Sequence, residues 1–276
     1  MPGIGAARSE ARRGSLSGRG AVRIKRDGRV LTFVNDDPPI NRMTLEYIDE
    51  IEAVLEDVRT DDSVRVVVFT ADGEDNFSVG MDLKQLRSEA ADRGGFEAVL
   101  DQRRRVLRTL ETMGKPSIAT LFGYCLGGGL ELPLACTFRL AATEGCKIGL
   151  PELDLGAVPA WGGSVRLTRT VGPTRALDMM LRHRMIGGPE SLDIGLVSEI
   201  HPVVELKSRA HALAHELARG PRLAMRGVMD AVQATLDHDL DTALDAEREA
   251  VRACQGTPDQ AEGGMAFLEK REPVFE

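Results

Sequence analysis

The segment that most constrains the fold is Gly123-Tyr-Cys-Leu-Gly-Gly-Gly-Leu-Glu131. It follows the apolar run Ser117–Phe122 and precedes a helix-compatible run that ends at Cys136. Three consecutive glycines leave no Cβ atom to obstruct a ligand at a strand-to-helix turn. The first N–H groups of the helix have no intrahelical partner and carry partial positive charge. The segment therefore predicts either an anion site beside the carboxylate of Glu131 or close packing of a helix on a sheet.

Length and composition exclude several classes of protein. With 276 residues, 42% of them apolar, the chain is long enough to bury a full core. Its net charge of -8 argues against a nucleic-acid footprint. No apolar run is long enough to span a bilayer, and the arginine-rich residues 1–20 lack the apolar region of a secretory signal. We expect these residues to be a disordered extension and the protein to be cytoplasmic.

The four cysteines show no metal-ligand spacing, so we expect small core residues in a reducing compartment. His211 and His215 are spaced four residues apart on a predicted helix, but Ala212 stands where the HExxH motif has glutamate. We expect no metal site and no cofactor.

The order of predicted elements indicates an α/β core followed by helices. Asp27-Gly28 separates two strand-like runs and predicts a hairpin. Thr44 is a candidate N-cap for a helix whose apolar residues recur every three or four positions. Further strands alternate with helices up to about residue 201, which predicts a mostly parallel sheet. Only helical patterns follow, so we place the boundaries at 1–20, 21–201 and 202–276.

Two carboxylates are candidates for acid–base chemistry. Glu131 is flanked by leucines, and Glu152 follows Pro151 at the end of an apolar strand-like run. A partly buried pair would raise the pKa of one member and provide one acid and one base. The ordinary alternatives are a solvated glutamate and a residue that favours the helix dipole.

Four segments together resemble the crotonase, or enoyl-CoA hydratase/isomerase, superfamily over residues 22–276. In chain order these segments are Phe77-Ser-Val-Gly-Met-Asp-Leu83, Gly123–Leu132, Ile148–Gly156 with Pro159 and Gly162-Gly163, and Gly264–Arg271. The resemblance implies a crotonase-like α/β spiral of ββα repeats with a C-terminal helical region that forms trimers or hexamers.

By the same resemblance, the N–H groups of Met81 and Gly128 form an oxyanion hole for an acyl-CoA thioester. Glu131 would orient and deprotonate a water molecule, and Glu152 would protonate the α-carbon. Because both glutamates are present, the resemblance favours an enoyl-CoA hydratase. The residues implied to bind the substrate or coenzyme A, which is part of the substrate, are Ile40, Met43, Ser78, Gly80, Asp82, Leu83, Lys84, Tyr124, Leu126, Gly127, Pro151, Leu155, Trp161, Phe267 and Lys270.

Departures from the family pattern leave other functions open. Trp161, the only tryptophan, stands where hydratases commonly have a small residue, and Leu150 replaces a residue that is often polar. Trp161 is expected either to reshape the acyl pocket or to pack structurally. The alternatives are an enoyl-CoA isomerase, an acyl-CoA decarboxylase or hydrolase, and a CoA- or RNA-binding homologue without catalysis.

Overall fold

A computed structural model describes residues 21–275. Its main sheet has six strands in the order β1-β2-β3-β4-β6-β8, and β1 is the antiparallel member. A second, two-stranded parallel sheet pairs β5 with β7. The strands are β1 Val22–Asp27, β2 Val30–Asn35, β3 Val66–Ala71, β4 Ser117–Leu121, β5 Tyr124–Leu126, β6 Phe138–Ala142, β7 Lys147–Gly149 and β8 Glu199–His201.

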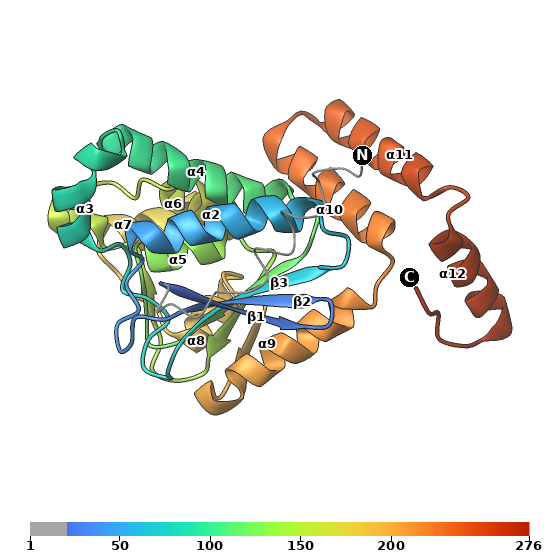
Figure 1. The fold of residues 1–276 in the computed structure, drawn as a ribbon, viewed down its shortest axis with the longest axis horizontal. Coiled ribbons are helices and arrows are strands. Elements are labelled where there is room, and N and C mark those ends of the chain that lie inside the picture. Colours follow the sequence, from blue (N-terminus) through green and yellow to red (C-terminus); the bar gives the residue numbers. More distant parts are fainter. Residues whose placement is uncertain (1–20, 276) are drawn as a thin grey trace, which may run out of the picture.

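Helices surround the main sheet, with α2, α4 and α5 on one side and α9 on the other (Figure 1). There are also two short 3-10 turns in the described residues. The first, η1 Ala91–Arg93, precedes α4, and the second, η2 Glu152–Leu155, follows β7. The α-helices are α2 Leu45–Thr60, α3 Leu83–Glu89, α4 Phe96–Thr112, α5 Gly128–Leu134, α6 Gly163–Val171, α7 Pro173–Leu181, α8 Gly188–Asp193, α9 Val203–Ala218, α10 Arg222–Asp237, α11 Leu240–Cys254 and α12 Pro258–Glu269. None of the described helices is long and apolar enough to cross a membrane.

Local sequence signals explain the first elements. The hairpin around Asp27-Gly28 is confirmed, with Asp27 paired to Val30. The hydroxyl of Thr44 accepts a hydrogen bond from the backbone N–H of Tyr47 at 3.1 Å, so the predicted cap of α2 is also confirmed. The predicted strand that ended at Glu152 is shorter, because β7 stops at Gly149 and Glu152 begins η2.

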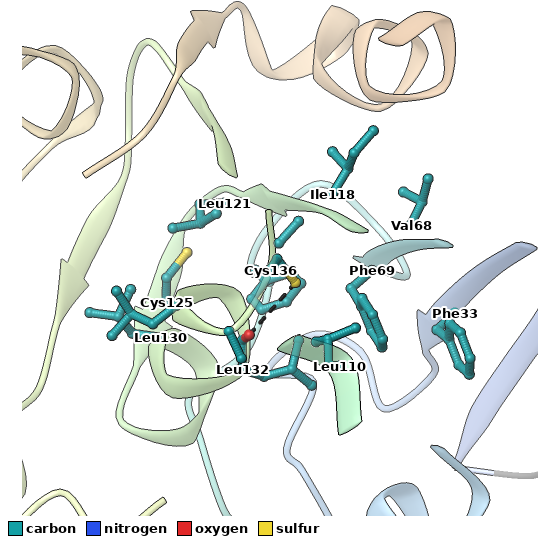
Figure 2. Close-up of a cluster of buried hydrophobic side chains, with 14 of the residues drawn as sticks. Phe33, Val68, Phe69, Leu110, Ile118, Leu121, Cys125, Leu130, Leu132 and Cys136 are labelled. Carbon is teal, nitrogen blue, oxygen red and sulfur yellow. Dashed lines mark hydrogen bonds between the residues drawn. The ribbon is translucent and has the colours of Figure 1, made fainter. Parts of the chain in front are cut away.

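The core lies between the sheet and the helices on its two sides. Figure 2 shows a part of it in which Phe33 and Phe69 stack, with ring centroids 4.7 Å apart. Cys125 and Cys136 pack there as small apolar residues, and Cys146 is buried as well. The expectation of core cysteines is confirmed for these three, while Cys254 is half-buried.

The packing of α9 separates it from the helices that follow. All strands end by His201, but α9 still buries Leu206, Ala210, Ala214 and Ala218 against the sheet. Helices α10 to α12 extend away from the sheet (Figure 1) and bury one residue each, Gly227, Ala243 and Ala266. In the part of the chain that the structure describes, only helices follow His201, as predicted, and the helices that lie apart from the sheet begin after Pro221. The predicted extension at residues 1–20 lies outside the described residues.

Candidate active site

A cavity of about 360 Å³ lies where α3, α4, the glycine turn before α5, η2 and the loop before α6 meet. The cavity wall is mainly apolar and contains both candidate glutamates. The predicted site residues that line it are Gly80, Met81, Leu83, Gly127, Gly128, Glu131, Pro151, Glu152, Leu155 and Trp161. Residues from four separate segments of the sequence are thus brought to one surface.

Two backbone N–H groups are available at this cavity. Met43 and Met81 form a parallel bridge, in which the N–H of Met43 donates to the carbonyl of Gly80 and the N–H of Asp82 donates to the carbonyl of Met43. The N–H of Met81 itself has no acceptor among the described residues. Gly128 is the first residue of α5, and its N–H group also has no acceptor among the described residues. Gly80 has a φ of 95°, and a Cβ atom there would lie 3.4 Å from the Gly128 nitrogen. The two donor segments are therefore adjacent.

Close packing accounts for the glycine next to this donor. A Cβ atom on Gly129 would lie 2.5 Å from the carbonyl oxygen of Ser78, and the hydroxyl of Ser78 accepts a hydrogen bond from Gly80. A Cβ atom on Gly128 would lie 2.4 Å from the Trp161 ring. The functional and packing interpretations of the glycine triplet therefore apply together, because the same buried segment carries the free N–H group and packs closely on Ser78 and Trp161.

Glu131 is buried with 2% of its surface exposed. Its Oε1 atom accepts hydrogen bonds from the backbone N–H groups of Trp161 and Gly163, each at 2.8 Å. Its Oε2 atom accepts none from the described residues. Burial raises the pKa of Glu131 from 4.5 to about 7, while the two backbone donors act in the opposite direction. Near neutral pH this carboxylate can therefore either take up or release a proton.

Glu152 is half-buried at the start of η2, and its charge also raises the pKa of Glu131. Its Oε1 atom lies 2.9 Å from the position of a Cβ on Gly127, and its Oε2 atom is buried without a hydrogen-bond partner among residues 21–275. Burial raises the pKa of Glu152 too. The site therefore combines two carboxyl groups whose pKa values are raised by burial with two free N–H donors.

Several predicted contact residues support the site without lining it. Met43 and Ser78 are fully buried, and Asp82 caps α3 and binds Arg42 at 3.0 Å. Of the others, Ile40, Lys84 and Tyr124 are exposed and Leu126 is half-buried. Lys84, Tyr124 and Leu126 are near cavity residues in sequence, and the carbonyl of Ile40 accepts a hydrogen bond from the backbone N–H of Val79 at 3.1 Å.

Phe267 and Lys270 are far from the cavity within one chain. They lie at the end of α12, which is at the opposite side of the molecule from α3 (Figure 1). The Phe267 side chain is 83% exposed. A role for these residues in substrate binding therefore requires a neighbouring subunit.

Sequence reasoning missed part of the cavity wall. Phe96 and Leu100 of α4 line the cavity, but no motif pointed to them. The available signal for these cavity residues was their position in the first two turns of α4. This helix begins after the glycine pair Gly94-Gly95. The further residues of the wall are Val79, Leu86, Arg87, Ala157, Val158 and Ala160.

Comparison with known proteins agrees with this geometry. A family model described as enoyl-CoA hydratase/isomerase matches residues 27–276. A crotonyl-CoA hydratase of Syntrophomonas wolfei is 33% identical over 91% of this chain and 95% of its own length. A short-chain-enoyl-CoA hydratase of Clostridium acetobutylicum is 32% identical over the same shares.

Solved structures of this type superpose closely. An enoyl-CoA hydratase from Bacillus anthracis has a TM-score of 0.86 and 31% identity, covering 92% of this chain and 98% of its own. A second, from Geobacillus kaustophilus, has a TM-score of 0.88 and 31% identity, covering 94% and 98%. The mixed α/β architecture is thus the crotonase fold expected from the sequence. With its fold, glycine turns and matched segments in agreement, this chain belongs to the enoyl-CoA hydratase/isomerase family.

Proposed function

We propose that this protein hydrates 2-enoyl-CoA thioesters, adding water across the 2,3 double bond. The observation that carries the proposal is the presence of Glu131 and Glu152 in one cavity with the free N–H groups of Met81 and Gly128. An isomerase needs only one carboxylate to move a proton, whereas hydration needs a base for water and an acid for the α-carbon. The names of the curated relatives support the same reaction.

The thioester oxygen accepts hydrogen bonds from Met81 and Gly128, so that negative charge can develop on it. Preorganised donors of this kind lower the barrier by roughly 3–4 kcal/mol each in other enzymes. The two glycine-bounded segments fix both donors before the substrate arrives. Coenzyme A then serves as part of the substrate, and no further cofactor is needed for the step.

The two glutamates divide the proton transfers. Glu131 accepts a proton from water through Oε2 while the hydroxyl forms a bond to the β-carbon, and Glu152 donates its proton to the α-carbon. Glu131 is more deeply buried than Glu152, and burial raises the pKa of both carboxyl groups. The hydrogen bonds from Trp161 and Gly163 favour the ionised form of Glu131, and they leave Oε2 for the water. We therefore assign Glu131 as the base and Glu152 as the acid.

A panel of thioesters tests this proposal. The protein is incubated with crotonyl-CoA, 3-enoyl-CoA and malonyl-type thioesters, and the products are identified by mass. A gain of one water on crotonyl-CoA is expected. An unchanged mass with a moved double bond would indicate an isomerase, while loss of carbon dioxide or release of free CoA would indicate a decarboxylase or a hydrolase.

We further propose that α10 to α12 assemble the chain into a trimer or a hexamer. The support is their exposed apolar side chains, among them Val228, Val232 and Leu268. In such an assembly Phe267 and Lys270 would reach the coenzyme A site of a neighbouring copy. Light scattering coupled to size exclusion tests this, and a monomer at all concentrations would contradict it.

A further inference from the structure

Arg103 of α4 is a fully buried arginine that forms no salt bridge within residues 21–275, although the charge of Asp49 acts on it. Its Nη1 atom donates to the carbonyl of Val99 at 3.2 Å, but its Nε and Nη2 atoms have no acceptor in residues 21–275. Burial lowers its pKa to about 10. Arginine is almost never fully buried unless paired, because the loss of hydration is costly. The position therefore calls for an explanation beyond core packing.

The guanidinium group lies against the ring of Trp161. Its central carbon is 4.8 Å from the ring centroid, which is cation–π distance. Arg103 continues the face of α4 on which Phe96 and Leu100 line the cavity, and its side chain folds back toward Val99. The guanidinium is thus the layer directly behind the Trp161 part of the cavity wall.

Trp161 lines two hollows. One is the cavity, where the benzo part of the ring lies next to Gly128. The other is an open groove of about 630 Å³ between α4 and α6, and there the Trp161 carbonyl accepts a hydrogen bond from Arg166. The groove walls are mostly charged residues, namely Asp101, Arg104, Arg105, Arg108, Glu111, Arg166 and Arg169.

We propose that Trp161 is the wall that limits the length of the acyl group, and that Arg103 is a positioning residue that holds the ring in place. The site then selects short 2-enoyl thioesters. This inference rests on the proposed function, because the ring stands beside the donor that would bind the thioester oxygen. Loss of the ring would leave its volume to a longer acyl chain, next to the CH₂ stem of Arg103 and toward the groove that Trp161 also lines.

The first experiment replaces the wall. Trp161→Ala is compared with the native protein by kcat/KM for 2-octenoyl-CoA and for crotonyl-CoA. We expect the octenoyl-to-crotonyl ratio to rise about tenfold or more, the scale on which pocket walls discriminate between acyl groups. Val165→Ala is the control, because Val165 lines only the groove, and it should leave the ratio unchanged. An unchanged ratio in Trp161→Ala would overturn the inference.

The second experiment removes the charge behind the wall. Arg103→Met keeps the volume and the apolar stem, and Arg104→Met on the exposed side of α4 is its control. Because Trp161 is the only tryptophan in the chain, its fluorescence reports directly on the ring. We expect a shifted emission, stronger quenching by acrylamide and a raised octenoyl-to-crotonyl ratio in Arg103→Met alone.

The outcomes separate three cases. If Arg103→Met leaves emission and ratio unchanged, Arg103 is only structural and the positioning role is wrong, whatever happens to the melting temperature. If Trp161→Ala does not fold, Trp161→Phe and Arg103→Met carry the same comparison. If the native protein hydrates no 2-enoyl thioester at all, the proposed function fails, which is distinct from hydration with an unaltered length profile in the variants.

Discussion

The α/β core and the last three helices of this chain differ in how many residues each helix buries. In α2, six residues are buried on one face, whereas α10, α11 and α12 each bury a single small residue. The last helices instead expose large apolar side chains, such as Val228 at 65% and Phe267 at 83%. The core completes its own interior and contains the proposed catalytic residues, while the helical region leaves apolar surface exposed. The difference teaches that the fold of the core and the proposed assembly can be altered separately.

The largest effect is expected for the carboxylates of the core. Glu152→Gln should lower kcat for crotonyl-CoA hydration about 10³-fold, or ~4 kcal/mol of barrier, because it removes the proton donor. Glu131→Gln should act similarly by removing the base. Steady-state kinetics with circular dichroism of each variant measure this, and a loss of less than tenfold in both would refute the two roles.

A matched pair of glycines compares the packing of the two regions. Gly129→Ala should destabilise the protein by about 3 kcal/mol, because the new Cβ would lie 2.5 Å from a backbone oxygen. Gly264→Ala in α12 has no atom within 4 Å of its Cβ and should stabilise its helix by about 0.5–1 kcal/mol. Denaturant unfolding measures both. Equal effects would mean that the helical region is packed as tightly as the core.

The buried charge of the core should appear in the pH dependence of stability. The folded pKa of Glu131, about 7, is above its ordinary value of 4.5, so its ionisation costs stability progressively as pH rises between these values. In Glu131→Gln this cost is absent. The free energy of unfolding of the variant should therefore gain about 2–3 kcal/mol over that of the native protein between about pH 5 and about pH 8. Parallel curves over that range would contradict the raised pKa.

The smallest effect on the core is expected from charges placed on α10. Val228→Asp with Val232→Asp should lower the assembled mass in light scattering, because both side chains are exposed apolar residues of the helical region. The unfolding free energy of the core should change by no more than about 0.5 kcal/mol. Val204→Asp, an equally exposed valine on α9, is the control and should leave the mass unchanged.

The sequence predicted the elements that have strong local signals. Asp27-Gly28 and Thr44 marked a turn and a cap whose geometry depends on neighbouring residues alone. The three-residue strand β5 was not predicted, because it is too short for any periodicity and its Tyr124 is exposed. Glu152 was expected to end a strand, but the residues after Gly149 turn into η2 through contacts that are distant in sequence.

The site could be predicted at the positions where the backbone conformation or a close contact requires glycine. Gly80 and Gly128 could be named from sequence because the donor segments approach too closely for side chains. Arg103 could not, because Arg103-Arg104-Arg105 looks like a solvated charge run. Its phase on α4, four residues after Val99 and three before Val106, was the available signal of burial. Its contact with the Trp161 ring depends on tertiary structure, so the sequence alone did not show it.

The bridges between Ser78 and Cys125 and between Met43 and Met81 have a consequence for the unfolded molecule. The two N–H donors come from segments that meet only when the main chain has closed over a long loop. A partly opened protein therefore lacks the proposed thioester site, and we expect ligand binding to be linked to this closure. In hydrogen-exchange measurements, a bound acyl-CoA should slow the exchange of the backbone amides in both segments together. The ligand would then stabilise two segments that are distant in the sequence.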